Sequence, residues 1–170
     1  KFLGKQVYPK ELEGTEIGAY LLATFDGNSE EQLEDIIEQA SEVVLEAGAI
    51  DVLVADTSAK MKDAWAARSS FLEAIMEETK LLDECDVVVP ISKIASYLEY
   101  VNSLQDKHQI KIRSFGHAGD GNLHIYVCRY GMPQDEWEAK CKAAMDDMYA
   151  EADRIGGLVS GEHGIGHAKQ

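Results

Sequence analysis

Apolar side chains recur at helical spacing in several long stretches of the chain. The first stretch has Ser29 and Gln32 at its start, the pattern of a capping box, and it ends at Gly48. The last stretch runs into the Gly156–Gly157 pair, which favours a helix end. The pattern therefore predicts helices over residues 29–47, 58–79, 92–104 and 134–155.

Shorter runs of β-branched and aromatic residues separate these helices and predict strands. The expected strands cover residues 16–25, 51–56, 86–89, 110–115 and 123–128. The last two are joined by a glycine-rich turn, which requires an antiparallel pair. We therefore expect an α+β fold with a mostly antiparallel sheet covered by helices, ferredoxin-like in arrangement. Residues 1–15 are polar and are interpreted as a tail or linker before a domain over 16–170.

Alternation along the strand over residues 123–128 separates two faces. Leu123, Ile125 and Val127 share the apolar face, whereas His124, Tyr126 and Cys128 share the other. His124 is therefore expected to point away from the main core, where a site can be built.

Composition narrows the classes of partner and compartment. The 16 basic and 31 acidic residues give a net charge of −15, which argues against nucleic acid or an anionic membrane surface as a partner. The three cysteines form no CxxC pair, and no apolar run is long enough to span a membrane. These features favour a cytoplasmic protein. Because the chain begins without methionine and has a motif close to its end, we expect a fragment of a longer protein.

Most histidines lie in two glycine-rich stretches, over residues 114–126 and 160–167. His117, His124 and Glu162 together make a two-histidine, one-carboxylate set, which suits a divalent metal such as zinc, iron or manganese. Glu162 and His163 are neighbours in an extended segment, so their side chains should diverge. If Glu162 faces the metal, His163 is available for proton transfer.

Three polar residues have more than one interpretation. Asp120 and Asn122 either orient the imidazoles or serve as turn residues. Arg68 interrupts an otherwise apolar helical face, and an unpaired buried guanidinium is costly. It therefore needs either a protein carboxylate or an anionic ligand.

The two glycine-rich motifs resemble the C-terminal domain of the FAD-linked oxidases. The resemblance rests on Gly116–His124 and Ser160–Gly166, with Trp65–Arg68 and Asp86–Pro90 as further segments in the expected order. This family includes D-lactate dehydrogenases, the flavin subunit of glycolate oxidase and D-2-hydroxyglutarate dehydrogenase. The resemblance implies a substrate domain that closes over the flavin of a separate FAD domain of the same polypeptide, and oxidation of a D-2-hydroxy acid.

The resemblance also implies residue roles. His117, His124 and Glu162 match metal ligands, His163 matches a base beside the flavin, and Arg68 matches the residue that holds the substrate carboxylate. We also take Asn122 as a candidate contact to the cofactor. The chain has no glycine-rich dinucleotide fingerprint, so we expect it to lack the FAD domain and to be inactive alone.

Leu72 and Tyr126 are expected to line the substrate pocket, Leu72 one helical turn after Arg68. An apolar side chain offers no hydrogen bond to replace the water that a second substrate carboxylate would lose on binding. We therefore expect a small monocarboxylate as substrate, D-lactate ahead of glycolate. A metal-dependent hydrolase and a non-catalytic ferredoxin-like binding module are the alternatives. The electron acceptor after FAD is left open.

Overall fold

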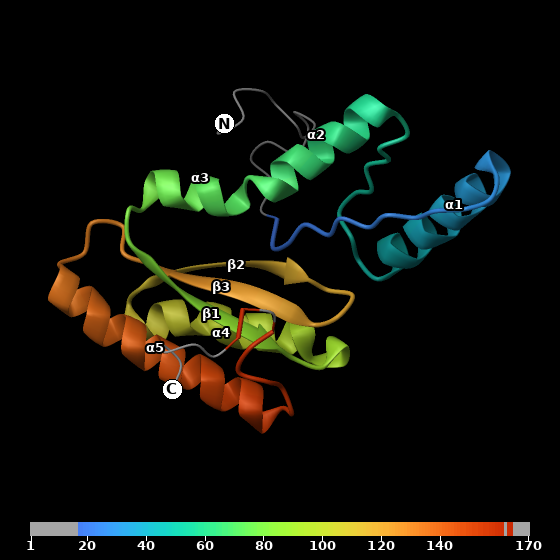
Figure 1. Cartoon of the computed structure of the whole chain (residues 1–170). Coiled ribbons are helices and arrows are strands. Elements are labelled where there is room, and N and C mark those ends of the chain that lie inside the picture. The colour runs from blue at the N-terminus through green and yellow to red at the C-terminus, as the bar shows by residue number, and fades with distance from the viewer. Residues whose placement is uncertain (1–16, 162, 165–170) are drawn as a thin grey trace. The chain divides into compact units, whose positions relative to one another are not determined.

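A computed structural model of the chain describes residues 17–161, 163 and 164 (Figure 1). The chain divides into two compact units, and the division falls between Ser70 and Phe71.

The first unit contains helices α1 (Glu30–Glu46) and α2 (Ser58–Ser69). The start and end of α1 confirm the prediction from the sequence. At the start, the backbone N–H of Gln32 donates to the Ser29 hydroxyl over 3.2 Å. At the end, the chain leaves the helix through Gly48, whose φ of +98° favours glycine.

The predicted strands over residues 16–25 and 51–56 are wrong where the structure describes them. Residues 17–25 and 51–56 form no strand in the described part of the chain. A strand requires a neighbouring backbone to pair with, and no described strand pairs with either segment. Most of their apolar side chains are exposed, and Leu21 retains 73% of its surface. A short run of apolar residues is therefore not sufficient for a strand.

The predicted single helix over 58–79 is also wrong, because α2 ends at Ser69 and α3 covers Phe71–Glu78. At the break, Ser70 has φ −95° and ψ 3°, and its hydroxyl donates to the Ala66 carbonyl over 2.6 Å. Serine side chains compete in this way with the helical backbone. Leu72 thus belongs to a different helix from Arg68, and the expected one-turn spacing between them is lost.

The second unit is built on a three-stranded sheet of β1 (Leu82–Val88), β2 (Lys111–His117) and β3 (Asn122–Cys128). The strand order is β1-β3-β2, and both outer strands run antiparallel to β3. This confirms the predicted hairpin. β1 begins at Leu82, earlier than the sequence pattern indicated, and its last residue Val88 forms an isolated bridge to Leu158.

Helices α4 (Ile94–His108) and α5 (Gln134–Arg154) cover one face of this sheet (Figure 1). A short 3-10 helix, η2 (Ile91–Lys93), precedes α4. The predicted start at residue 92 is therefore two residues early, because α4 begins at Ile94, after Lys93, without a side-chain cap. The core between sheet and helices contains Cys85, Val87, Val101, Leu104, Ile112, Leu123, Ile125, Val127, Ala144 and Met148.

The fold is α+β with an antiparallel sheet covered by helices, as the sequence indicated. All three cysteines are buried thiols, and burial raises the pKa of Cys128 to about 11. Among the described helices, none combines the length and the apolar character that a membrane crossing would need.

Candidate active site and metal centre

The two faces of the sheet have opposite character, as the alternation in β3 predicted. Leu123, Ile125 and Val127 lie in the core beneath α4 and α5. His124 and Tyr126 therefore lie on the other face. Strand register places their neighbours on this polar face: β1 contributes Glu84 opposite Tyr126 and Asp86 opposite His124, and β2 contributes Phe115 opposite His124 and His117 opposite Asn122.

The structure brings His117 and His124 together. Their ring centroids lie 5.8 Å apart with an angle of 81° between the planes. The turn between β2 and β3 makes this possible, because the Gly121 amide donates back to the His117 carbonyl over 3.0 Å. Gly121 has φ +82°, and a Cβ there would overlap the Val89 carbonyl, so the turn requires glycine.

Glu84 joins this group, and the analysis of the sequence missed it. One of its carboxylate oxygens accepts hydrogen bonds from His124 Nδ1 and from the Tyr126 hydroxyl, both over 3.0 Å. The other oxygen lies 3.4 Å from His163 Nδ1. Alternation along β1 would have indicated Glu84, but the predicted strand began only at Asp86.

His163 also reaches the site, and its imidazole stacks on that of His124 with centroids 5.1 Å apart and planes 27° apart. Its side chain remains 48% exposed, whereas that of His124 is 6% exposed. Ligand atoms of Glu84, His124 and His163 lie within 4.8 Å of one another. Two imidazoles and one carboxylate at this spacing fit a divalent metal.

Asp86 is the second carboxylate that the analysis of the sequence did not single out. It is fully buried, and one of its oxygens accepts the backbone N–H groups of Gly161 and His163, each over 3.1 Å. The two oxygens lie 4.0 Å from His124 Nδ1 and from His163 Nδ1, respectively. Asp86 therefore contacts the backbone of the segment that carries His163 more closely than it contacts the rings.

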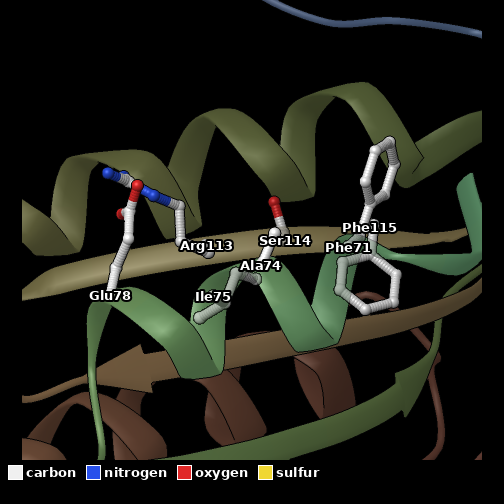
Figure 2. A pocket seen from close by; sticks show the side chains of 7 residues that line it. All are labelled: Phe71, Ala74, Ile75, Glu78, Arg113, Ser114 and Phe115. Atoms are coloured by element: carbon white, nitrogen blue, oxygen red, sulfur yellow. The ribbon is translucent and has the colours of Figure 1, made fainter. Parts of the chain in front are cut away.

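Aromatic rings extend the polar face toward α3. Phe115 stacks on Tyr126 with centroids 5.3 Å apart, and it packs edge-on against Phe71 of α3 at 5.7 Å. Figure 2 shows the open groove between α3 and β2 that these rings adjoin. Its lining residues are Phe71, Ala74, Ile75, Glu78, Arg113, Ser114 and Phe115.

The remaining predicted residues of the second unit lie as follows. Asp120 stabilises the turn, because its side chain accepts a hydrogen bond from the backbone N–H of Asn122 over 2.9 Å. Asn122 is buried, and Leu72 is half-buried in α3 and does not line the groove of Figure 2. Glu162 lies outside the described residues. The roles of Asn122, Leu72 and Glu162 stay predictions.

Arg68 belongs to the first unit, where it is half-buried in the last turn of α2. Two apolar residues of the same helical face, Met61 and Trp65, are 45% and 52% exposed. Its role toward a substrate stays a prediction.

Comparisons with known proteins identify relatives of the chain. The chain is 70% identical over 169 residues to a D-lactate dehydrogenase of Anaerostipes hadrus, covering 99% of this chain and 36% of that protein. It is 32% identical to a D-lactate dehydrogenase of Archaeoglobus fulgidus, covering 98% and 35%, and 34% identical to the glycolate oxidase subunit GlcD of Bacillus subtilis, covering 91% and 33%. The chain thus spans about a third of the length of these curated relatives.

A D-2-hydroxyglutarate dehydrogenase of Stutzerimonas stutzeri is also similar, with 27% identity over 100% of this chain and 37% of that protein. Residues 4–170 match the family described as FAD linked oxidases, C-terminal domain. Because this match covers nearly the whole chain, the protein belongs to the FAD-linked oxidase family and corresponds to its C-terminal domain.

Proposed function

We propose that this chain is the substrate- and metal-binding part of a flavin-dependent dehydrogenase that oxidises a small D-2-hydroxy acid. The observation that carries the proposal is the gathering of His117, His124, His163 and Glu84 on one sheet face, in a chain 70% identical to a D-lactate dehydrogenase. FAD would be held mainly by another domain of the same polypeptide, with Asn122 as the candidate contact from this chain.

The metal site would use His117 and His124 with one carboxylate. Glu162 is the carboxylate that the sequence favours, and Glu84 is the one described beside His124. A divalent zinc, iron or manganese ion bound there would lower the pKa of the substrate 2-hydroxyl. The donor set of imidazole and carboxylate fits each of these metals.

His163 would take the hydroxyl proton while a hydride leaves the substrate Cα for the flavin. Glu84 supports this role: if the imidazole Nδ1 donates to that carboxylate, Nε2 is the nitrogen that accepts the proton. Arg68 would bind the substrate carboxylate, which a guanidinium does with two parallel hydrogen bonds.

We propose D-lactate as the preferred substrate, ahead of glycolate and of any dicarboxylate. Leu72 and Tyr126 would line the pocket, and Tyr126 already donates its hydroxyl to Glu84. The Glu84 and Asp86 carboxylates add negative charge beside the histidines. A second substrate carboxylate there would be desolvated and repelled.

We also propose a ferredoxin-like arrangement for the second unit. The order β1, α4, β2, β3, α5 supports it, as does the bridge from Leu158 to the outer side of β1, where a fourth strand would lie. The proposed compartment is the cytoplasm.

Steady-state kinetics of the full-length flavin-loaded enzyme test the substrate proposal. We expect kcat/KM for D-lactate to exceed that for D-2-hydroxyglutarate by at least about 100-fold. A preference for the dicarboxylate would contradict the proposal, and no oxidation of any 2-hydroxy acid would contradict the activity itself.

Metal analysis of three histidine variants tests the assigned roles. His124→Asn should lose the metal, and His163→Asn should keep it while kcat falls. His108→Asn is the matched control, because His108 bonds to Asp147 between α4 and α5, away from the site. Loss of metal in His163→Asn would make His163 a ligand, with Glu84 and His124, and would refute its role as the base.

A further inference from the structure

Asp86 is a buried carboxylate whose main partners are backbone groups of a distant segment. It is 0% exposed, and it accepts the Gly161 and His163 amides over 3.1 Å and the Ser160 hydroxyl over 3.5 Å. A carboxylate in such a place is costly unless hydrogen bonds compensate it. Because the Ser160–His163 segment supplies these donors, Asp86 and the segment depend on each other.

Gly161 allows this segment to approach so closely. A Cβ added at Gly161 would overlap the Asn122 amide and would lie 2.7 Å from an Asp86 carboxylate oxygen. These side chains cannot retreat easily, because both are buried in the sheet. We call Asp86, Asn122 and the overlying backbone of Gly161 the Asp86 socket.

The socket fixes the backbone of His163, whose ring lies in the proposed site. The same residue donates its backbone N–H to Asp86 and places Nδ1 3.4 Å from Glu84. Its ring is stacked on His124 although nearly half of its side chain is exposed. A half-exposed side chain has few packing contacts to hold it, so its position depends strongly on where the backbone is held.

We propose that Asp86 is a positioning residue, which anchors the Ser160–His163 segment to β1 and thereby places the His163 imidazole in the site. The inference rests on the proposed function for its effect on turnover, but the anchoring itself does not. Asp86 makes its hydrogen bonds to the backbone rather than to the rings, because its distances to His124 and His163 Nδ1 are 4.0 Å, beyond hydrogen-bond range.

Hydrogen exchange in the full-length flavin-loaded enzyme measures the anchoring. In Asp86→Ala, we expect peptides over residues 157–164 to exchange at least about 10-fold faster, while peptides from β3 keep their protection. In Asp86→Asn, one amide oxygen can still accept an N–H, so exchange should lie between wild type and the alanine variant. Asp83→Asn is the matched control: Asp83 lies on the same strand, is exposed, and accepts the backbone N–H of the neighbouring Glu84.

Turnover measured on the same variants connects the anchor with His163. A misplaced base lowers kcat more than it weakens substrate binding, so Asp86→Ala should lower kcat about 100-fold with a smaller change in KM. Asp86→Asn should recover part of this loss, and Asp83→Asn should change neither constant. The graded order of kcat should follow the graded order of exchange.

Two results would overturn the proposal. One is a fall in kcat without faster exchange over 157–164, because Asp86 would then act directly on the chemistry. The other is faster exchange throughout the sheet, because Asp86 would then support the fold alone.

If Asp86→Ala fails to fold, Gly161→Ala replaces it. The added methyl group should release the segment while the Asp86 carboxylate stays, and unchanged exchange over 157–164 would overturn the anchoring. If the wild type oxidises no 2-hydroxy acid, the exchange result still decides the anchoring.

Discussion

The two units of this protein have similar patterns of apolar residues but bury them very differently. In the first unit, no residue of α1 is buried, and Ile50 is 59% exposed. In the second unit, Ile125 and Val101 are completely buried between the sheet and its helices. An amphipathic pattern therefore specifies a helix, but burial also needs a second element with a complementary face.

In the second unit, the sheet provides the complementary face against which the helices bury their apolar residues. α4 and α5 place their apolar faces on the same side of the three strands. The opposite side is then left for polar chemistry, and the histidines and carboxylates of the site occupy it. The comparison predicts that the second unit, which contains the described cluster of Glu84, His124 and His163, also provides most of the stability.

A pair of isoleucine truncations gives the largest expected effect. Ile125→Ala removes a completely buried side chain from the central strand, which should lower the free energy of unfolding by about 2–5 kcal/mol. Ile50→Ala removes the same atoms from an exposed position and should change it by less than about 0.5 kcal/mol. Urea unfolding of each variant measures both values.

Equal costs for the two substitutions would break the comparison. Such a result would show that Ile50 is buried in solution as deeply as Ile125. A small cost for Ile125→Ala, with an unchanged denaturant slope, would instead show that the core of the second unit relaxes around the loss.

Amide hydrogen exchange should also distinguish the two units. Residues 17–25 and 51–56 belong to no described strand, so their amides should exchange within minutes. The amides of β3 pair with both neighbouring strands and should be protected much longer. If the two segments were as protected as β3, the predicted strands would form in solution after all.

The smallest expected effect concerns a charge cluster that joins α4 to α5. The Asp147 carboxylate accepts hydrogen bonds from Lys107 and His108, each over 2.6 Å. The hydrogen bond from Lys107, and after it the hydrogen bond from His108, lowers the pKa of the Asp147 carboxyl below its ordinary value. The stability from this shift is present above the ordinary aspartate pKa and is lost as pH falls through the lowered one.

Acidification from pH 5 to pH 3 should therefore lower the Tm of the wild type more than that of Asp147→Asn. The difference should be only about 1–3 °C, because the cluster is partly exposed and screened. Asp146→Asn is the matched control, since Asp146 pairs with Lys142 inside α5 alone. A larger effect in the control would show that the pairing between helices contributes nothing.

The sequence was most informative where local rules and tertiary packing agree. The cap at Ser29, the hairpin and the two faces of β3 all followed from spacing and turn chemistry. The break between α2 and α3 falls at Ser70, whose hydroxyl bonds back to the helix, but Ser41 makes the same bond inside the unbroken α1. The apolar pattern continues across the break and therefore did not indicate it.

The candidate site was only half predictable for a related reason. His117, His124 and His163 stand in conspicuous glycine-rich motifs, but Glu84 and Asp86 stand in an ordinary strand. Their importance comes from strand register, which places Glu84 beside Tyr126 and Asp86 beside His124. Pairing between residues about 40 positions apart is a tertiary property that one sequence does not display.

The long reach of these contacts also sets an order of events in folding. The bonds from Glu84 to β3 span 40 and 42 positions, whereas those from Asp86 to the C-terminal segment span 74 to 77. Closing a longer loop costs more chain entropy, so the segment with His163 should dock after the sheet has formed. By the same reasoning it should detach first under mild denaturant, so the His163 ring should leave the proposed site while the sheet is still intact.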